Sequence, residues 1–474
     1  MTSSVDGLVS GLSTSSLISQ LLKVEAQPQN RLKTKVSDAQ TAVTSYMSVN
    51  TKIAAVKSAG GGLSQLDTWR SIKAASSSAT VTATTSSTMK ATTGSLTFDV
   101  TSLASKQATT MQVSTALEDA DGDGQVDDPH PLTNATSISI TKGSYDSNGT
   151  FTAGAAAATS IDISKDQSAA GIAQAINDAN LGISAYVMKT DDGVGVLQIT
   201  GMKSGAANGF QIDGLTGTGL NGDSPATTAP KDATLQLKGG NNTSYAVHSD
   251  TNTFNNLMGG VTVVVSKEET GVTVDATSDV DAIADKFSAF VDATNAALTE
   301  IGTQTKYDPA TKTGSPLTGD FAVRNMSQKL LSLVSSGLSW TDEAAANPGT
   351  DYSTSIKSLK ELGIELDGAT GQLKFNRGAF LGSYAEDPSR VKAAGMKFGD
   401  QVTTLGTTMT RNLSAIMNGR NNDITDLNTQ ISNWDVRLTA KQEALQKQYS
   451  ALEVALGKLK DQSSWLSGQL GGAS

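Results

Sequence analysis

The sequence predicts an α+β multidomain protein: paired N- and C-terminal α-helical legs forming a coiled coil, with an inserted β-rich head of one or two domains. Three observations favour this class. Apolar residues recur at helical spacing near the amino terminus, the period changes to two in the centre, and a seven-residue repeat runs along the last part of the chain. The 474 residues allow about three domains at roughly 150 residues each.

The amino-terminal segment, residues 1–75, is predicted to be a helical leg. Ser15 and Ser16 can cap a first helix, and Pro28 interrupts it. A second, longer apolar stripe continues to Val56, and we expect the three glycines at 60–62 to end that helix. The apolar residues assigned to the assembly seam of this leg are Leu17, Leu21, Val24, Leu32, Val36 and Val43.

The central segment is predicted to be the head. Leu96, Phe98 and Val100 alternate with polar neighbours, which is the strand pattern, and similar short runs continue to Val274. One short helix, at about residues 168–179, interrupts them. We divide the head into a first part at residues 76–115, a nested domain at 116–224 and a second part at 225–278.

The helical period returns after the head, in residues 279–474, which we assign to a C-terminal helical region and leg. Val280, Ile283, Phe287 and further apolar residues share one face, with Thr294 as a single polar member. More helix is expected at about residues 321–333, followed by a hairpin at 362–375.

The last helix has the most informative pattern, because no proline follows Pro388. A strict seven-residue repeat predicts supercoiling around a partner. The alternative is one long core helix of a globular domain. The repeat that we assign to the assembly seam is Ile424, Ile431, Leu438, Leu445, Leu452, Leu459 and Leu466.

The composition excludes several classes of function. The chain carries 36 Lys and Arg residues against 46 Asp and Glu residues, so its formal net charge is -10. Because a phosphate backbone is bound by a basic surface, we expect no nucleic-acid partner. No apolar run reaches the roughly 18 residues that span a bilayer, so we expect no membrane insertion. The absence of cysteine removes disulfides and thiolate metal sites.

Neither the first residues nor the histidines indicate processing or catalysis. No Lys or Arg precedes Lys23 and no apolar block lies ahead of it, so we expect no cleaved secretory signal and export by another route. His130 and His248 each stand alone in loop-like sequence, whereas a triad or zinc site needs further groups beside them. The sequence therefore predicts no enzyme and no required cofactor.

One acidic stretch in the head has the spacing of a calcium loop. Asp119, Asp121 and Asp123 are followed by a glycine, and Asp127 can add a water-bridged ligand. The twelfth position, normally a bidentate carboxylate, is His130, which does not suit calcium. The stretch is therefore either a structural Ca²⁺ site or a solvated acidic turn.

Residues 7–28 resemble the opening of the flagellar filament cap family, also called hook-associated protein 2. They read Gly-Leu-Val-Ser-Gly-Leu-Ser-Thr, then an apolar helix, then Glu-Ala-Gln-Pro before the long helix. The similarity continues at Gly319-Asp320, at residues 359–368 and at Asp387-Pro388. Residues 168–185 are similar to a short repeat inserted in flagellins and hook proteins, and residues 108–160 match nothing in the family.

This resemblance implies a structural protein of the bacterial flagellum. It would be secreted through the flagellar channel, held by an export chaperone before secretion, and located at the distal filament tip. There it would form a homo-oligomeric ring, commonly a pentamer, that promotes flagellin polymerisation and filament elongation and so supports motility. Two alternatives stay open: another axial protein (flagellin or a hook–filament junction protein), and a tip-exposed adhesin that acts in cell adhesion.

Overall fold

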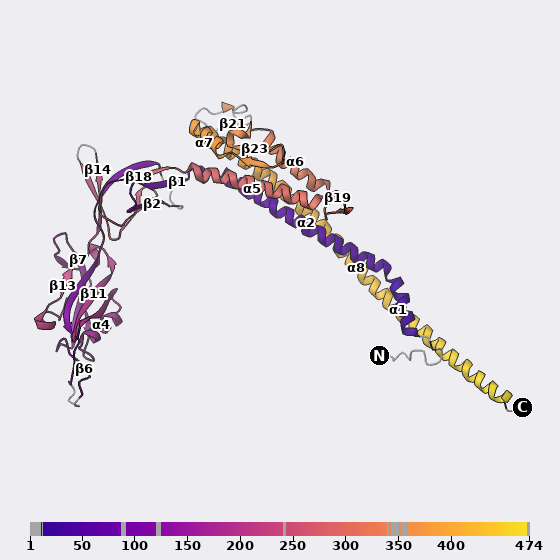
Figure 1. The fold of residues 1–474 in the computed structure, drawn as a ribbon, viewed down its shortest axis with the longest axis horizontal. Helices are drawn as coiled ribbons and strands as arrows, with labels where there is room; N and C mark the ends of the chain where they lie inside the picture. Colours follow the sequence, from indigo (N-terminus) through magenta and orange to yellow (C-terminus); the bar gives the residue numbers. More distant parts are fainter. Residues whose placement is uncertain are drawn as a thin grey trace. The chain divides into compact units, whose positions relative to one another are not determined.

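The computed structural model describes residues 11, 13–86, 92–119, 125–239, 243–338, 341–342, 350–351 and 358–471. These residues form two compact units, shown in Figure 1. The helical unit combines Met1–Trp69 with Val280–Ser474, so it is built from both ends of the chain. The strand-rich unit is Arg70–Asp279. This α+β organisation, with a β-rich insertion between paired helical ends, confirms the predicted fold class.

The described residues of the amino-terminal part of the helical unit form three helices. They are α1 (Thr14–Glu25), α2 (Gln27–Ser64) and α3 (Leu66–Trp69). Pro28 stands in the first turn of α2, where its missing N–H is not needed. The expectation that the glycines at 60–62 end the helix is wrong, because α2 continues through them. Gly60 lies against Val402 so closely that a Cβ on the glycine would collide with that side chain. Tertiary packing therefore overrides the low helix propensity of glycine.

The carboxy-terminal part begins with α5 (Val280–Thr305), which packs along α2. Thr294 of this helix is fully buried, and its hydroxyl donates to the Phe290 carbonyl at 2.8 Å. That bond satisfies the one polar member of the apolar stripe. The remaining elements before the last helix are β19 (Tyr307–Asp308), β20 (Thr313–Gly314), α6 (Phe321–Ser335), β21 (Thr341–Asp342), β22 (Thr350–Asp351), the 3₁₀ turn Leu359–Leu362, β23 (Ile364–Leu366), β24 (Leu373–Phe375) and α7 (Arg377–Glu386).

The core of the helical unit lies where these elements meet the last helix, α8 (Pro388–Gly471). Four phenylalanines are fully buried there: Phe287, Phe290, Phe380 and Phe398. The predicted hairpin at residues 362–375 is confirmed as β23 and β24. The Asn295 amide joins it to α5 by accepting from the Leu373 N–H and donating to the Leu373 carbonyl, both at 2.8 Å.

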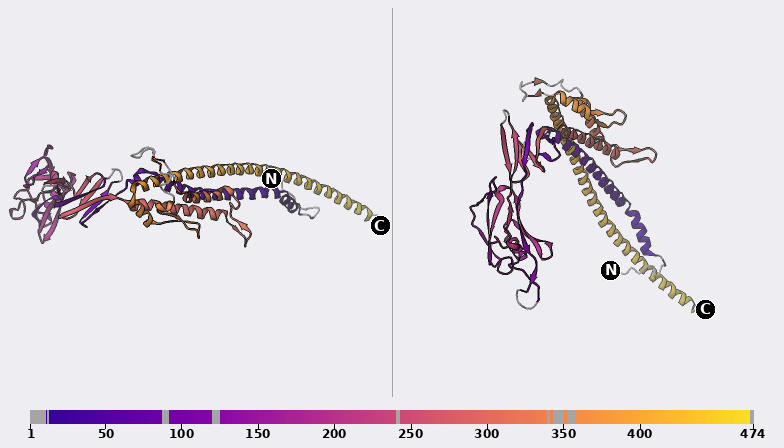
Figure 2. Two further views of the ribbon diagram at one scale, coloured as in Figure 1. Left: turned by 90° about the horizontal axis from the view of Figure 1, so that it is seen from above. Right: turned by 60° about the vertical axis from the view of Figure 1, so that its left-hand side comes forward.

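The last helix has 84 residues and begins at the final proline, well before Ile424, where the predicted repeat starts. At about 1.5 Å per residue, α8 is roughly 125 Å long. Its first part, up to Leu413, contributes to the core. Helix α2 pairs with it from the level of Val402 to that of Asp435, and α1 packs on it beyond that point. Figures 1 and 2 show α8 continuing past the start of α1. Both chain ends therefore contribute to one helical leg.

The strand-rich unit has two hydrophobic cores. The first lies in the lobe built from the first and last strands of the unit, which we call the outer lobe because its sequence encloses that of the second lobe. Its five-stranded sheet has the order β1-β18-β3-β14-β15, and its three-stranded sheet has the order β16-β17-β2. Residues 72–75, which the sequence boundaries assign to the leg, form part of β1. The strands are β1 (Ile72–Ser76), β2 (Val81–Thr85), β3 (Gly94–Ser102), β14 (Ala233–Lys238), β15 (Ser244–Ser249), β16 (Thr253–Met258), β17 (Val261–Val265) and β18 (Glu269–Ser278).

The nested lobe contains the second core. One sheet has the order β10-β11-β4-β13 and a second the order β12-β7-β8, with β9 paired to β7. The predicted short helix is α4 (Ala169–Asp178), which packs on β10. The other elements are β4 (Lys106–Ser114), β5 (Leu117–Glu118), β6 (Asp128–Pro129), β7 (Ser137–Tyr145), β8 (Phe151–Ala153), β9 (Thr159–Asp162), β10 (Ile183–Asp191), β11 (Val194–Ser204), β12 (Gly209–Asp213) and β13 (Ala226–Thr228).

Strand β4 belongs to the nested lobe, although the sequence boundaries place residues 106–114 in the outer part. It pairs with β11 and with β13. Two of its inward residues, Gln107 and Thr109, are polar. The alternation of apolar and polar residues that indicates a strand is therefore incomplete in the sequence. The buried Gln107 amide donates to the Phe210 carbonyl at 2.7 Å and accepts from the Phe210 N–H at 2.8 Å. Because both groups are paired, burial of this side chain is tolerated.

Candidate assembly surface

The leg is closed where α2 meets α8. Val49, Ile53 and Val56 are buried on the face of α2 that packs in the core. Gly399 of α8 approaches so closely that an added Cβ would lie 2.6 Å from the Gly60 carbonyl oxygen. Here the two helices pack backbone against backbone, which leaves no room for another partner.

A polar contact fixes the two helices further along the leg. The Gln29 side chain is buried, and its amide donates to the Asp435 carboxylate at 2.5 Å and to the Ile431 carbonyl at 3.3 Å. A buried amide without partners would cost free energy, so this contact favours one register of α2 on α8.

Tyr46 ties α2 to α6. Its hydroxyl donates to the carboxylate of Asp320, and the same carboxylate accepts from the Val323 N–H at 3.0 Å at the start of α6. Burial, followed by the hydrogen bond to Asp320, raises the pKa of Tyr46 to about 12. The phenol therefore stays protonated at neutral pH, and its role is that of a structural donor.

Along this stretch of the leg, most residues assigned to the assembly seam are buried or half-buried. Val36 is buried, and Leu32 and Val43 are half-buried on α2. On α8 the first four members of the repeat are half-buried: Ile424, Ile431, Leu438 and Leu445. The same chain therefore partly covers this part of the repeat.

The last three members of the repeat lie in a different environment. Leu452 is 47% exposed, Leu459 is 60% exposed and Leu466 is 55% exposed. All three lie near or beyond the level at which α1 begins, because Thr14 shares a groove with Val454. The seven-residue repeat therefore continues as an exposed apolar row.

The residues assigned to the assembly seam on α1 lie to one side of the face that packs against α8, and their role in assembly stays a prediction. Leu17 is 37% exposed, Leu21 is 44% exposed and Val24 is 70% exposed, whereas Ile18 is buried. The exposure of these three residues has a simple reason. Helix α1 has apolar residues at both sets of helical spacing, and the set that contains Ile18 and Leu22 faces α8. The sequence alone does not distinguish the two faces.

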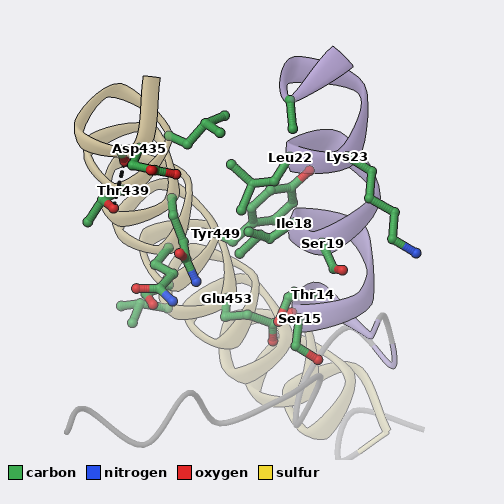
Figure 3. A pocket seen from close by; sticks show the side chains of 16 residues that line it. Thr14, Ser15, Ile18, Ser19, Leu22, Lys23, Asp435, Thr439, Tyr449 and Glu453 are labelled. Carbon is green, nitrogen blue, oxygen red and sulfur yellow. Dashed lines mark hydrogen bonds between the residues drawn. The ribbon is translucent and has the colours of Figure 1, made fainter. Parts of the chain in front are cut away.

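A groove of about 710 Å³ runs between α1 and α8 (Figure 3). Ile18 and Leu22 from α1 and Tyr449 from α8 point into it, and Leu438 adds to the apolar lining. Ala26 and Val454 also line the groove, and the other lining residues are polar or charged: Thr14, Ser15, Ser19, Lys23, Asp435, Thr439, Gln442, Gln446, Ser450 and Glu453. An apolar floor with a polar rim suits a side chain of another helix better than a small charged ligand.

The predicted calcium ligands are only partly described. Asp119 directly follows β5 and Asp127 directly precedes β6, while Asp121 and Asp123 lie outside the described residues. His130 pairs with Glu118 at 2.7 Å across the β5–β6 hairpin. Within the described ranges, no group of three or more His, Cys, Asp or Glu side chains could hold a metal ion. The calcium site stays a prediction.

The other histidine has a structural environment. His248 lies in β15, not in a loop as its sequence context suggests, and its Nδ1 is 3.0 Å from the Thr234 hydroxyl on the neighbouring strand. Among the helices of the described residues, none is long and apolar enough to cross a membrane.

Comparisons with known proteins agree with this architecture. Residues 10–107 match the family described as "Flagellar hook-associated protein 2 N-terminus", and residues 230–461 match "Flagellar hook-associated protein 2 C-terminus". The flagellar hook-associated protein 2 of Escherichia coli K12 is 23% identical over 487 residues, which cover 98% of this chain and 97% of that protein. The protein of the same name from Salmonella typhimurium LT2 is 27% identical over 223 residues, or 44% of this chain and 45% of the relative.

A solved structure extends the likeness to the fold. The crystal structure of the flagellar cap protein FliD D1-D2-D3 domains from Escherichia coli aligns with a TM-score of 0.53 and 22% identity. The alignment covers 80% of this chain and 99% of that one. Two family matches, which together cover the helical unit and the outer lobe and leave residues 108–229 between them, confirm the resemblance seen in the sequence. The chain belongs to the flagellar hook-associated protein 2 family.

Proposed function

We propose that this chain caps the distal tip of the bacterial flagellar filament, where it retains incoming flagellin and promotes its polymerisation. Membership of the hook-associated protein 2 family is the observation that carries the proposal. The same comparisons favour a cap over the other axial proteins and over an adhesin. The protein is secreted and acts outside the cell, and its role is structural.

The leg supports a role in assembly because it separates a closed part from an open part. The closed part, where Gly60 and Gly399 meet, needs no partner. The open part consists of the exposed row Leu452, Leu459 and Leu466 on α8 together with the groove beside α1. Exposed apolar rows of this kind mark protein–protein contacts. We assign them to contacts with flagellin at the filament tip and with other copies in the ring.

The further partners follow from the same proposal. Copies of the chain form a ring, for which five is the common number in the family that the sequence resembles. An export chaperone covers the exposed leg before secretion, because long apolar rows in an unassembled chain promote aggregation. No cofactor is assigned a role.

A gene-deletion strain tests the proposal directly. We expect cells without this chain to release flagellin monomers into the medium, to lack long filaments and to swim poorly, and the intact gene to restore all three. The measurements are flagellin in the culture supernatant and filament length by electron microscopy. Full-length filaments in the deletion strain would rule out the capping function.

A further inference from the structure

Helix α1 presents different surfaces on its two sides. An α-helix turns about 100° per residue, so positions around α1 can be compared with Ile18, which is buried against α8. Leu17, Leu21 and Val24 lie roughly 90° to one side of Ile18. Ser15, Ser19 and Ala26, which line the groove, lie on the other side. We call the first surface the α1 stripe and the second the α1–α8 groove.

The two surfaces are complementary in character. The stripe consists of three large apolar side chains within two turns, all exposed. The groove has an apolar floor built from Ile18, Leu22 and Tyr449 and a volume of about 710 Å³. Lys23 and Glu25 are the charged residues of α1, and neither lies on the stripe. The stripe itself therefore brings no charge into the groove, and the charges near the contact are those of the groove lining, Lys23, Asp435 and Glu453.

The two surfaces also lie at the same level of the leg. Helices α1 and α8 run antiparallel, since Gln29 contacts Asp435 while Thr14 lies beside Val454. Leu17 is therefore close to the level of Ser450, and Leu21 to that of Gln446. A second leg that runs alongside in the same direction brings its stripe to this groove with no shift along the axis.

We propose that the α1 stripe of one copy inserts into the α1–α8 groove of the next copy, so that the legs pack side by side. The contact joins two different surfaces, so it is a head-to-tail contact that closes a ring or continues as a chain. It rests on the proposed ring of the cap and specifies which surfaces meet in the leg. The groove is continuous with the α1–α8 interface through Ile18 and Leu22, and a copy of the same chain supplies both surfaces at matching height.

Engineered cysteines test the contact, because the chain contains no natural cysteine. In the full-length protein, we expect the double variant Leu21→Cys with Gln446→Cys to form a ladder of disulfide-linked multimers under mild oxidation. A second pair one turn along, Leu17→Cys with Ser450→Cys, should give the same ladder. This pair keeps the test decisive if the first double variant does not fold. Disulfides need Cα atoms within about 7 Å, so the ladder reports a close contact.

The matched control is Leu21→Cys with Val436→Cys. Val436 is 72% exposed on α8 but does not line the groove, so we expect no ladder from this pair. Each single-cysteine variant should stay uncrosslinked. Dimers from Leu21→Cys alone would show that like surfaces meet, which overturns the head-to-tail contact.

Two further outcomes separate this contact from the capping function. Rings seen by electron microscopy without any ladder from either pair would overturn the contact and leave the cap standing. Failure of the capping function itself would appear in the deletion strain as normal filaments, which the crosslinking experiment does not measure.

Discussion

The part of the leg where α2 meets α8 and the part where α1 meets α8 use the same kind of helix pairing with opposite results. In the first, Val49, Ile53 and Val56 are buried and glycines bring the backbones together. In the second, the repeat on α8 passes from half-buried to exposed, and a groove stays open beside it. Pairing within the chain completes the fold in one part and leaves a surface for assembly in the other.

The largest effect on stability is expected in the closed part. Gly399→Ala places a Cβ 2.5 Å from the Ser64 nitrogen and 2.6 Å from the Gly60 oxygen, both of which are backbone atoms. Because backbone cannot move aside cheaply, we expect a loss of about 3 kcal/mol in the free energy of unfolding. Urea unfolding followed by circular dichroism measures it.

Gly419→Ala is the matched control on the same helix. No atom lies within 4 Å of the added Cβ at this position, so only helix propensity changes. We expect a gain of about 0.5–1 kcal/mol. A similar loss for both variants would mean that close packing of α2 on α8 does not hold the closed part together.

The largest effect on function is expected in the half-buried middle of the repeat. Leu445→Arg places a charge in the seam between the helices. Burying part of an unpaired charge there costs about 1–3 kcal/mol, and we expect the assembled leg to be less stable by that amount. We expect the variant to be secreted with its strand-rich unit folded, and cells that carry it to release flagellin and swim poorly.

Lys441→Glu tests whether that effect depends on the seam. Lys441 is exposed on the same helix and is not a member of the repeat. We expect near-normal filaments, since exposed charges contribute little. Normal filaments in Leu445→Arg cells as well would show that the seam is not an assembly surface.

A smaller effect is expected from Tyr46→Phe in the closed part. The variant loses one hydrogen bond to Asp320, worth about 1 kcal/mol. The pKa of Tyr46 is raised from 10.0 to about 12, so the unfolded chain releases this proton first. The stabilisation is therefore complete below pH 10.0 and is lost as the pH rises through about 12. Alkaline unfolding of both proteins measures it, and parallel pH curves would contradict the assignment.

The smallest effect is expected from Asp367→Asn in the β23–β24 hairpin. Lys374, which lies 2.5 Å away, and then the Ala369 N–H lower the pKa of Asp367 from 3.8 to about 2. The stabilisation is thus present above pH 3.8 and is lost as the pH falls through about 2. We expect the variant to show a shallower acid transition in that interval and normal ring assembly. Impaired ring assembly would instead mean that this hairpin also belongs to the assembly surface.

The sequence predicts much of this architecture because most elements have a clear apolar period. The repeat from Ile424 to Leu466 locates the later part of the last helix, and the alternation around Phe98 locates β3. In both cases the period that the backbone imposes matches the side-chain pattern.

Other features could not be predicted because they depend on contacts distant in sequence. Helix α2 passes through its glycines because Val402 and Gly399 pack on them. Strand β4 is hidden because Gln107 is buried with Phe210 as its partner. On α1, Leu17 and Ile18 fit helical spacing equally well, so only the position of α8 decides which of them is buried.

Hydrogen exchange along the leg tests the central claim most directly. The free chain and the chain bound to filament-tip fragments would be compared peptide by peptide. We predict that the peptides containing Ile53 and Val402 are protected in both samples, whereas those containing Leu452, Leu459 and Leu466 exchange fast in the free chain and slowly at the tip. Equal exchange of the last three in both samples would contradict an open leg that is completed by assembly.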